Sequence, residues 1–179
     1  MTYGDSKRGQ GTTPVWAKVV GGLIRKEHNL EAWPVDIRWR YNRTGKTFSS
    51  GRTVYVAGSD LSGTYVTVTA GSNTMDEIVV FIHEMAHVVV GHGEGHSYYY
   101  WQTAYRLFQR FDLPFAYCYY RSSTYRDTAW WVAEQMYDIP EDTVAKCRAI
   151  AAGRVKMPRV DVNNWYPKKF DWRDLLGLE

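Results

Sequence analysis

The chain has 179 residues, of which 45% are hydrophobic and 23% charged, and its formal net charge is +3. These values are typical of one ordinary globular domain, and the small charge does not by itself indicate nucleic-acid binding. No apolar run reaches the roughly 18 residues that a membrane span needs, so we expect no membrane partner. Cys118 and Cys147 lack the close spacing of a zinc ribbon or redox motif. With no apolar secretion segment after Met1, we expect a cytoplasmic protein.

The first helix is expected after a short leader. Residues 1–13 are polar and glycine-rich, which predicts a flexible leader. Thr13 is a candidate N-cap, and Pro14 suits the first turn of a helix. Apolar residues then recur at helical spacing as far as about His28: Val15, Trp16, Val19, Val20, Leu23 and Ile24.

Three strands are predicted next, at residues 35–41, 53–57 and 64–69. The first and third alternate between apolar and polar residues, and the second is short and β-branched. The glycines at 45, 51, 58, 63 and 71 are interpreted as turn positions. Together these segments predict a small, three-stranded and mostly antiparallel sheet, in which residues 64–69 are a candidate exposed edge.

Helices are predicted from about residue 75 onward. Asn73 or Thr74 can cap the first of them, Asp76 and Glu77 favour its N-terminal end, and Gly91 ends it. Ser97 can cap a second helix over 98–111, and residues 127–137 and 140–152 predict two more. The fold class is therefore α+β, with one domain over residues 14–153 and an extended C-terminal tail over 154–179.

The HEMAH motif of residues 83–87 lies in the first of these helices. Positions i and i+4 share one helical face, so His83 and His87 can reach the same ion. Glu84 is offset to the side, where it can meet a metal-bound water. Two histidines and a glutamate on an apolar helix are costly to bury unless they are paired or bound to metal. The alternative is a pair of hydrogen-bonded core histidines.

A catalytic zinc ion needs a third protein ligand and an open fourth position. His96 is the first candidate, because the glycine-rich segment 91–95 can fold back and present it just before the next helix. His92 is the second candidate and Glu94 the third. The expected cofactor is one zinc ion.

Residues 76–101, DEIVVFIHEMAHVVVGHGEGHSYYYW, resemble the core of SprT-like zincin metallopeptidases, including small metallohydrolases of actinobacteria and their phages. In that family a third histidine opens a second helix and is followed by Gly-x-x-aromatic. Here His96, Ser97 and Tyr100 occupy those places, with Ser97 replacing the usual glycine and Tyr99 the usual glutamate. The resemblance covers about residues 14–112. It implies a zincin-like order of helix, three strands, active-site helix and second helix.

The sequence therefore predicts a zinc-dependent hydrolase that cleaves peptide bonds in a protein or peptide substrate. Zinc held by His83, His87 and His96 would activate a water molecule, with Glu84 as the general base. His92, Tyr98 or Tyr99 are candidates for stabilising the oxyanion. An extended peptide could pair with the strand at 64–69.

Two alternative functions remain open. Residues 1–74 hold ten Lys/Arg against five Asp/Glu, and Arg38, Arg40 and Arg43 lie near one predicted strand. These features fit a nucleic-acid-associated protein with a structural metal site, although a solvated strand face explains them more simply. The second alternative is a metal-dependent effector that acts on a non-peptide bond.

Overall fold

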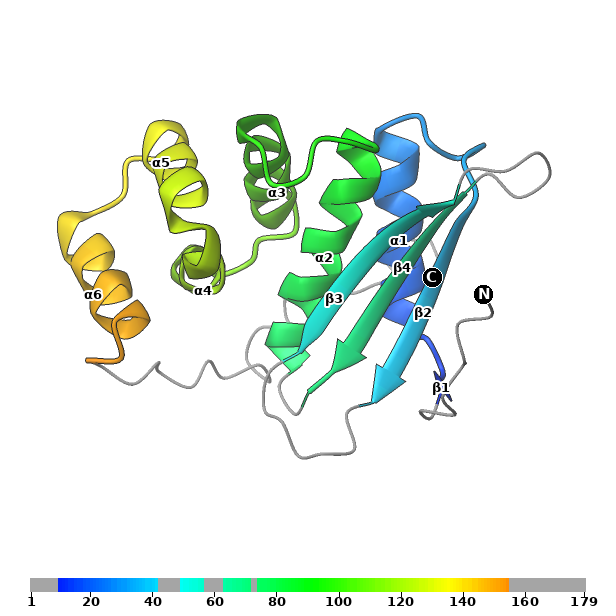
Figure 1. Ribbon diagram of the computed structural model, residues 1–179, viewed down its shortest axis with the longest axis horizontal. Coiled ribbons are helices and arrows are strands. Elements are labelled where there is room, and N and C mark those ends of the chain that lie inside the picture. Colours follow the sequence, from blue (N-terminus) through cyan, green and yellow to red (C-terminus); the bar gives the residue numbers. More distant parts are fainter. Residues whose placement is uncertain (1–9, 42–48, 57–62, 72–73, 155–179) are drawn as a thin grey trace, which may run out of the picture. The chain divides into compact units, whose positions relative to one another are not determined.

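The computed structural model describes residues 10–41, 49–56, 63–71 and 74–154 (Figure 1). These residues form two compact units, and the division falls between Val89 and Val90. Residues 1–9 of the expected leader lie outside the described residues, as do Arg43 and residues 155–179 of the expected tail.

The first unit contains a sheet and two helices in the predicted order. The helices are α1 (Val15–Glu27) and α2 (Thr74–Val90). The strands are β1 (Gln10–Gly11), β2 (Val35–Tyr41), β3 (Ser50–Val56) and β4 (Gly63–Ala70). The α+β class and the succession of helix, sheet and histidine-bearing helix are confirmed.

The sheet is mixed, with the strand order β1-β2-β4-β3. β1 pairs antiparallel with β2, and β3 pairs antiparallel with β4, but the central pair β2–β4 is parallel. The prediction that residues 64–69 form an exposed edge is wrong, because β4 lies between β2 and β3. Val66 and Val68 of β4 are fully buried, as suits a central strand. Among the described strands, β3 forms one edge of the sheet and the short β1 forms the other.

Both helices of this unit pack on one face of the sheet. Trp16 of α1, Trp39 of β2 and Phe81 of α2 contact one another, with ring centroids 5.5 to 6.1 Å apart. The register aligns Trp39, Val68 and Gly51 in one row across the sheet. Residues of β3 that share this face therefore point toward the helices.

The N-terminus of α1 differs in detail from the prediction. Pro14 occupies the N-cap position and makes no side-chain capping bond. The Thr13 hydroxyl instead donates to the carbonyl of Ile37, at 2.9 Å. Thr13 therefore joins the helix start to β2 rather than capping the helix.

The second unit is helical. It contains α3 (Tyr98–Arg110), α4 (Phe115–Arg121), a short 3₁₀ turn η1 (Ser123–Tyr125), α5 (Arg126–Met136) and α6 (Glu141–Ala151). Helix α4, which is short and rich in aromatic residues, was not predicted from the sequence. Tyr119 of α4 stacks on Trp130 of α5 with ring centroids 4.8 Å apart, and the Trp130 indole donates to the Tyr119 carbonyl at 2.8 Å.

The structure also bears on the two cysteines and on membrane-spanning helices. Cys118 and Cys147 are buried free thiols. None of the described helices has the length and apolar character required to cross a bilayer.

Candidate metal centre

Helix α2 carries two of the three candidate ligands. It is mostly buried, with Ile82, Met85 and Ala86 at 0% exposure. His83 and His87 are one turn apart on the same face, and their ring centroids lie 5.3 Å apart. Both side chains are only half-buried, so the helix presents them at the margin of its apolar core.

The third ligand is positioned by a glycine-rich turn. Gly91, Gly93 and Gly95 have φ angles of +85°, +100° and +54°. Residues that carry a Cβ atom rarely adopt such backbone angles. The turn ends at Ser97, whose hydroxyl oxygen accepts a hydrogen bond from the Tyr100 amide at 3.2 Å and caps α3. His96 is thereby held immediately before a capped helix.

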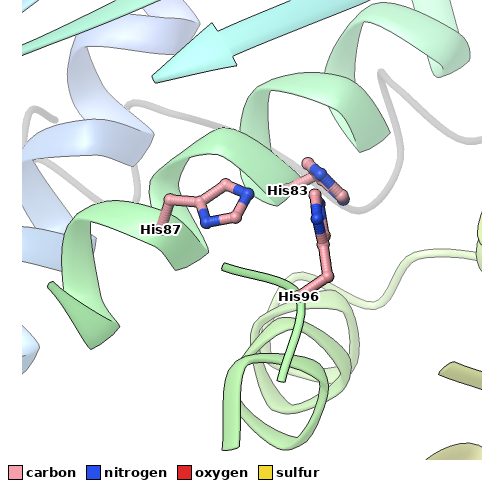
Figure 2. A group of neighbouring side chains, drawn as sticks. All are labelled: His83, His87 and His96. Atoms are coloured by element: carbon pink, nitrogen blue, oxygen red, sulfur yellow. The ribbon is translucent and has the colours of Figure 1, made fainter. Parts of the chain in front are cut away.

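The structure brings His83, His87 and His96 together. One nitrogen from each ring lies within 4.8 Å of the other two, and Figure 2 shows the three rings converging from α2 and from the start of α3. Within the part of the chain that the structure describes, this is the single group of three or more His, Cys, Asp or Glu side chains that could hold a metal ion.

The donor set fits a divalent transition metal. Neutral imidazoles are borderline ligands that suit zinc, copper, iron and nickel. A tetrahedral site with Zn–N bonds of about 2.0–2.1 Å separates its nitrogens by about 3.4 Å. The observed separations of no more than 4.8 Å place the three nitrogens near that spacing. Three ligands also leave one coordination position open.

Aromatic rings surround His96. Tyr125 stacks on its imidazole with ring centroids 3.9 Å apart and an interplanar angle of 21°. Trp101 lies parallel to it at 5.8 Å, and Tyr100 meets it edge-on at 4.9 Å. Burial among these rings lowers the pKa of His96. The neutral imidazole that a metal requires is thereby favoured.

Glu84 is the buried carboxylate beside these histidines, and only 5% of it is exposed. The Thr53 hydroxyl on β3 lies 2.6 Å from its Oε2 and donates to it. Burial raises the pKa of Glu84 to about 7, and the hydrogen bond from Thr53 opposes that rise. A carboxyl group with such a pKa can exchange protons near neutral pH.

The β3 residues that position Glu84 were not predicted as part of the site from the sequence. A Cβ atom on Gly51 would lie 2.8 Å from Cδ of Glu84, so any larger residue would displace that side chain from its present position. The Tyr55 hydroxyl donates to the backbone carbonyl of His87. Burial, reinforced by the charge of Glu84, raises the pKa of Tyr55 to about 12. Gly51, Thr53 and Tyr55 alternate along the strand, so period-two spacing could have placed them on one face.

The N-terminus of α2 is fixed by a second buried carboxylate. Asp76 has 0% exposure and accepts a hydrogen bond from the backbone amide of Ser49. The Ser49 hydroxyl oxygen in turn accepts from the Gly71 amide at 2.9 Å. These bonds join the helix start to the segments before β3 and after β4. They help to set the position of His83 and His87 relative to the sheet.

The remaining candidates from the sequence lie outside the three-histidine cluster. His92 is exposed and is not part of the histidine cluster. The Glu94 carboxylate accepts a hydrogen bond from the Ser97 hydroxyl at 2.8 Å, so it supports the turn. Tyr98 and Tyr99 are 41% and 51% exposed, and they remain candidates for contacting a substrate.

Comparisons with known proteins identify no relative. No family model matches the sequence, and it has no significant match among curated proteins or solved structures.

Proposed function

We propose that this chain is a zinc-dependent hydrolase, and specifically a metallopeptidase. The observation that carries the proposal is the pairing of three converging imidazoles with a buried carboxylate. Glu84 directly follows His83 in the chain, and its pKa of about 7 suits a general base at neutral pH. The resemblance of residues 76–101 to SprT-like zincins favours the same activity.

Zinc is the expected metal because its usual geometry matches three histidines and one open position. When bound, it supplies a Lewis acid that lowers the pKa of a water molecule and polarises the carbonyl of a substrate. His83, His87 and His96 would hold it.

Glu84 would perform the proton transfers. Its carboxylate would take a proton from the attacking water and later deliver that proton to the leaving amine. The hydrogen bond from Thr53 fixes one carboxylate oxygen, Oε2, and so orients the other. The tight space beside Gly51 further restricts the side chain. Such restriction favours catalysis, because a positioned base avoids the entropic cost of being oriented.

The edge strand β3, which lies beside Glu84 and His87, supports a peptide as the substrate. β3 pairs only with β4 among the described strands, and its Thr53 and Tyr55 contact Glu84 and His87. Figure 1 shows β3 beside α2. An extended peptide can add to an exposed sheet edge through backbone hydrogen bonds. A peptide bound along β3 would pass close to Glu84.

The test compares wild-type protein with Glu84→Gln on quenched fluorescent peptides and on an unfolded protein substrate. Glutamine keeps the shape of the side chain but cannot act as a base. Zinc content should stay the same, while kcat/KM falls by about 10²- to 10⁴-fold. Full activity in Glu84→Gln would contradict the mechanism. A zinc-loaded wild type that cleaves no peptide would favour the non-peptide alternative, which a screen of ester, amide and phosphoester substrates would then examine.

The nucleic-acid alternative has weaker support. The Arg38 guanidinium lies 2.7 Å from a carboxylate oxygen of Asp36 and 4.0 Å from the centroid of Tyr65. These contacts suit a solvated strand face. DNA binding with a steep dependence on salt concentration would favour the alternative.

A further inference from the structure

A cavity lies wholly within the helical unit, and it involves none of the three histidines. Its volume is about 490 Å³, within the range of small-molecule sites. It is bordered by the C-terminal end of α3, the start of α4 and the connection from α5 to α6. The proposed hydrolase does not use it.

Aromatic rings form the wall of this cavity. Tyr105 and Phe108 of α3 contact each other with centroids 5.8 Å apart, and Phe115 lies 5.1 Å from Tyr137. The Tyr137 hydroxyl donates to the Tyr105 carbonyl at 3.1 Å, which fixes this ring against α3. The wall therefore offers ring faces in fixed positions, and such faces attract both apolar groups and cations.

The charged groups that line the cavity are all acidic. Asp112 and Asp138 both line it and are both exposed, whereas no lysine or arginine is among its described lining residues. An apolar cavity with carboxylates at an exposed position is complementary to an apolar ligand that carries a positive charge.

The backbone at Asp112 gives a second reason to consider this residue. Its φ angle is +51°, in the left-handed region that favours glycine. Its amide donates to the Gln109 carbonyl at 2.9 Å, and the Leu113 amide donates to the Phe108 carbonyl at 2.9 Å. This pattern is the Schellman motif, which usually has glycine at the position of Asp112. Asp112 therefore belongs to the C-terminal capping motif of α3 and lines the cavity.

We propose that this cavity is a second binding site, independent of the metal, for an organic cation with an aromatic or aliphatic body. The body would pack against Tyr105, Phe108 and Phe115, and an ammonium or guanidinium group would face Asp112 and Asp138. The same chemistry occurs in a free amine and in a lysine or arginine side chain of a peptide.

The experiment is a titration of the full chain followed by ¹H–¹⁵N NMR. The probes are phenethylamine, its neutral analogue phenethyl alcohol and its anionic analogue phenylacetate. We expect the amine to shift the amide signals of Leu113, Ile139 and Thr143 and to bind more tightly than the alcohol, with the acid weakest. Equal affinity for the amine and the alcohol would overturn the proposal. So would shifts confined to residues around His96.

Variants test the role of the carboxylates. Asp112→Asn and Asp138→Asn should each weaken phenethylamine binding roughly three- to fivefold, as expected for partly exposed ion pairs. Asp127→Asn is the matched control, because Asp127 is exposed on α5 and does not line the cavity. Asp112→Gly distinguishes a loss of charge from a loss of folding. Glycine suits the positive φ angle at this position, so the variant should resist urea better than wild type. It should nevertheless bind the amine less tightly, because the carboxylate is missing. Unchanged affinity in both Asn variants would contradict the proposal.

Two further comparisons test whether the ligand is a free amine or a peptide side chain, and whether binding at the cavity depends on the metal site. A blocked Ala-Lys-Ala peptide that binds more tightly than phenethylamine assigns the site to a peptide side chain, and the reverse order assigns it to a free amine. Binding should be the same after zinc removal and in Glu84→Gln. A loss of amine binding on zinc removal would contradict an independent site, whereas a failed peptidase assay would leave the site unaffected.

Discussion

The Thr53 hydroxyl on β3 donates a hydrogen bond to Oε2 of Glu84 on α2, across 2.6 Å. This bond joins one edge strand of the described sheet to the carboxylate that we propose as the base. It explains why a strand distant in sequence from the HEMAH motif belongs to the same site.

Thr53→Val should lower activity without removing the metal. Valine keeps the shape of the side chain but cannot donate, and a hydrogen bond to a charged group contributes about 1.5–3 kcal/mol, which corresponds to at least about tenfold in kcat/KM. Zinc affinity should be unchanged. The measurement is peptide hydrolysis by zinc-loaded protein. Thr67→Val is the control, because Thr67 is on the opposite face of β4, and equal activities of the two variants would contradict this role for Thr53.

Gly51→Ala should also impair catalysis more than folding. The added Cβ would lie 2.8 Å from Cδ of Glu84 and would force the carboxylate to move. Displacement of a catalytic group by about 1 Å can cost about 100-fold in rate. Gly22→Ala adds the same atom in α1, where nothing lies within 4 Å of it, and should keep full activity. Normal kcat/KM in Gly51→Ala would show that Glu84 does not need this space.

The sequence predicted much of the fold and the candidate ligands. The helical spacing around residues 83–87 and the cap at Ser97 were sufficient to place His83, His87 and Ser97 correctly, because these features depend on local geometry. The position of β4 in the centre of the sheet was not predicted. Strand order depends on pairing between segments that are distant in the sequence, here β2 with β4, and a local pattern does not reveal such pairing. Gly51 was assigned to a turn because a local pattern cannot reveal contact with Glu84, 33 residues away in the sequence.

Tyr125 should affect metal affinity through His96. Its ring stacks on the imidazole at 3.9 Å, and such pairs contribute about 0.5–1.5 kcal/mol beyond simple burial. Tyr125→Ala should therefore weaken zinc binding by about two- to tenfold, measured by competition with a chromogenic chelator. Tyr125→Phe retains the ring and should bind zinc as wild type does. Equal losses in both variants would assign the effect to the hydroxyl group instead of the stacking.

Glu77 should make stability dependent on pH. Burial, reinforced by the charge of Asp76, raises the pKa of Glu77 from its ordinary value of 4.5 to about 7. The folded state therefore binds the proton more tightly than the unfolded state, and wild-type stability should fall as pH rises from 4.5 through 7. Glu77→Gln should be more stable than wild type at pH 8 by on the order of 1 kcal/mol, allowing for partial solvation of the group.

The measurement for Glu77 is urea unfolding of metal-free protein at pH 4.5 and pH 8. The advantage of Glu77→Gln should largely disappear at the lower pH, where the carboxyl group is protonated in the folded state and about half protonated in the unfolded state. An equal difference at both values of pH would show that the effect is one of packing and not of charge.

The most direct test of the central claim is a zinc titration of wild-type protein, His96→Ala and His92→Ala, read out as stoichiometry and affinity. The three-histidine site predicts one zinc per wild-type chain, the same for His92→Ala, and a large loss of affinity for His96→Ala. A wild-type chain that binds no zinc, or a His96→Ala variant that binds it as tightly as wild type, would contradict the account.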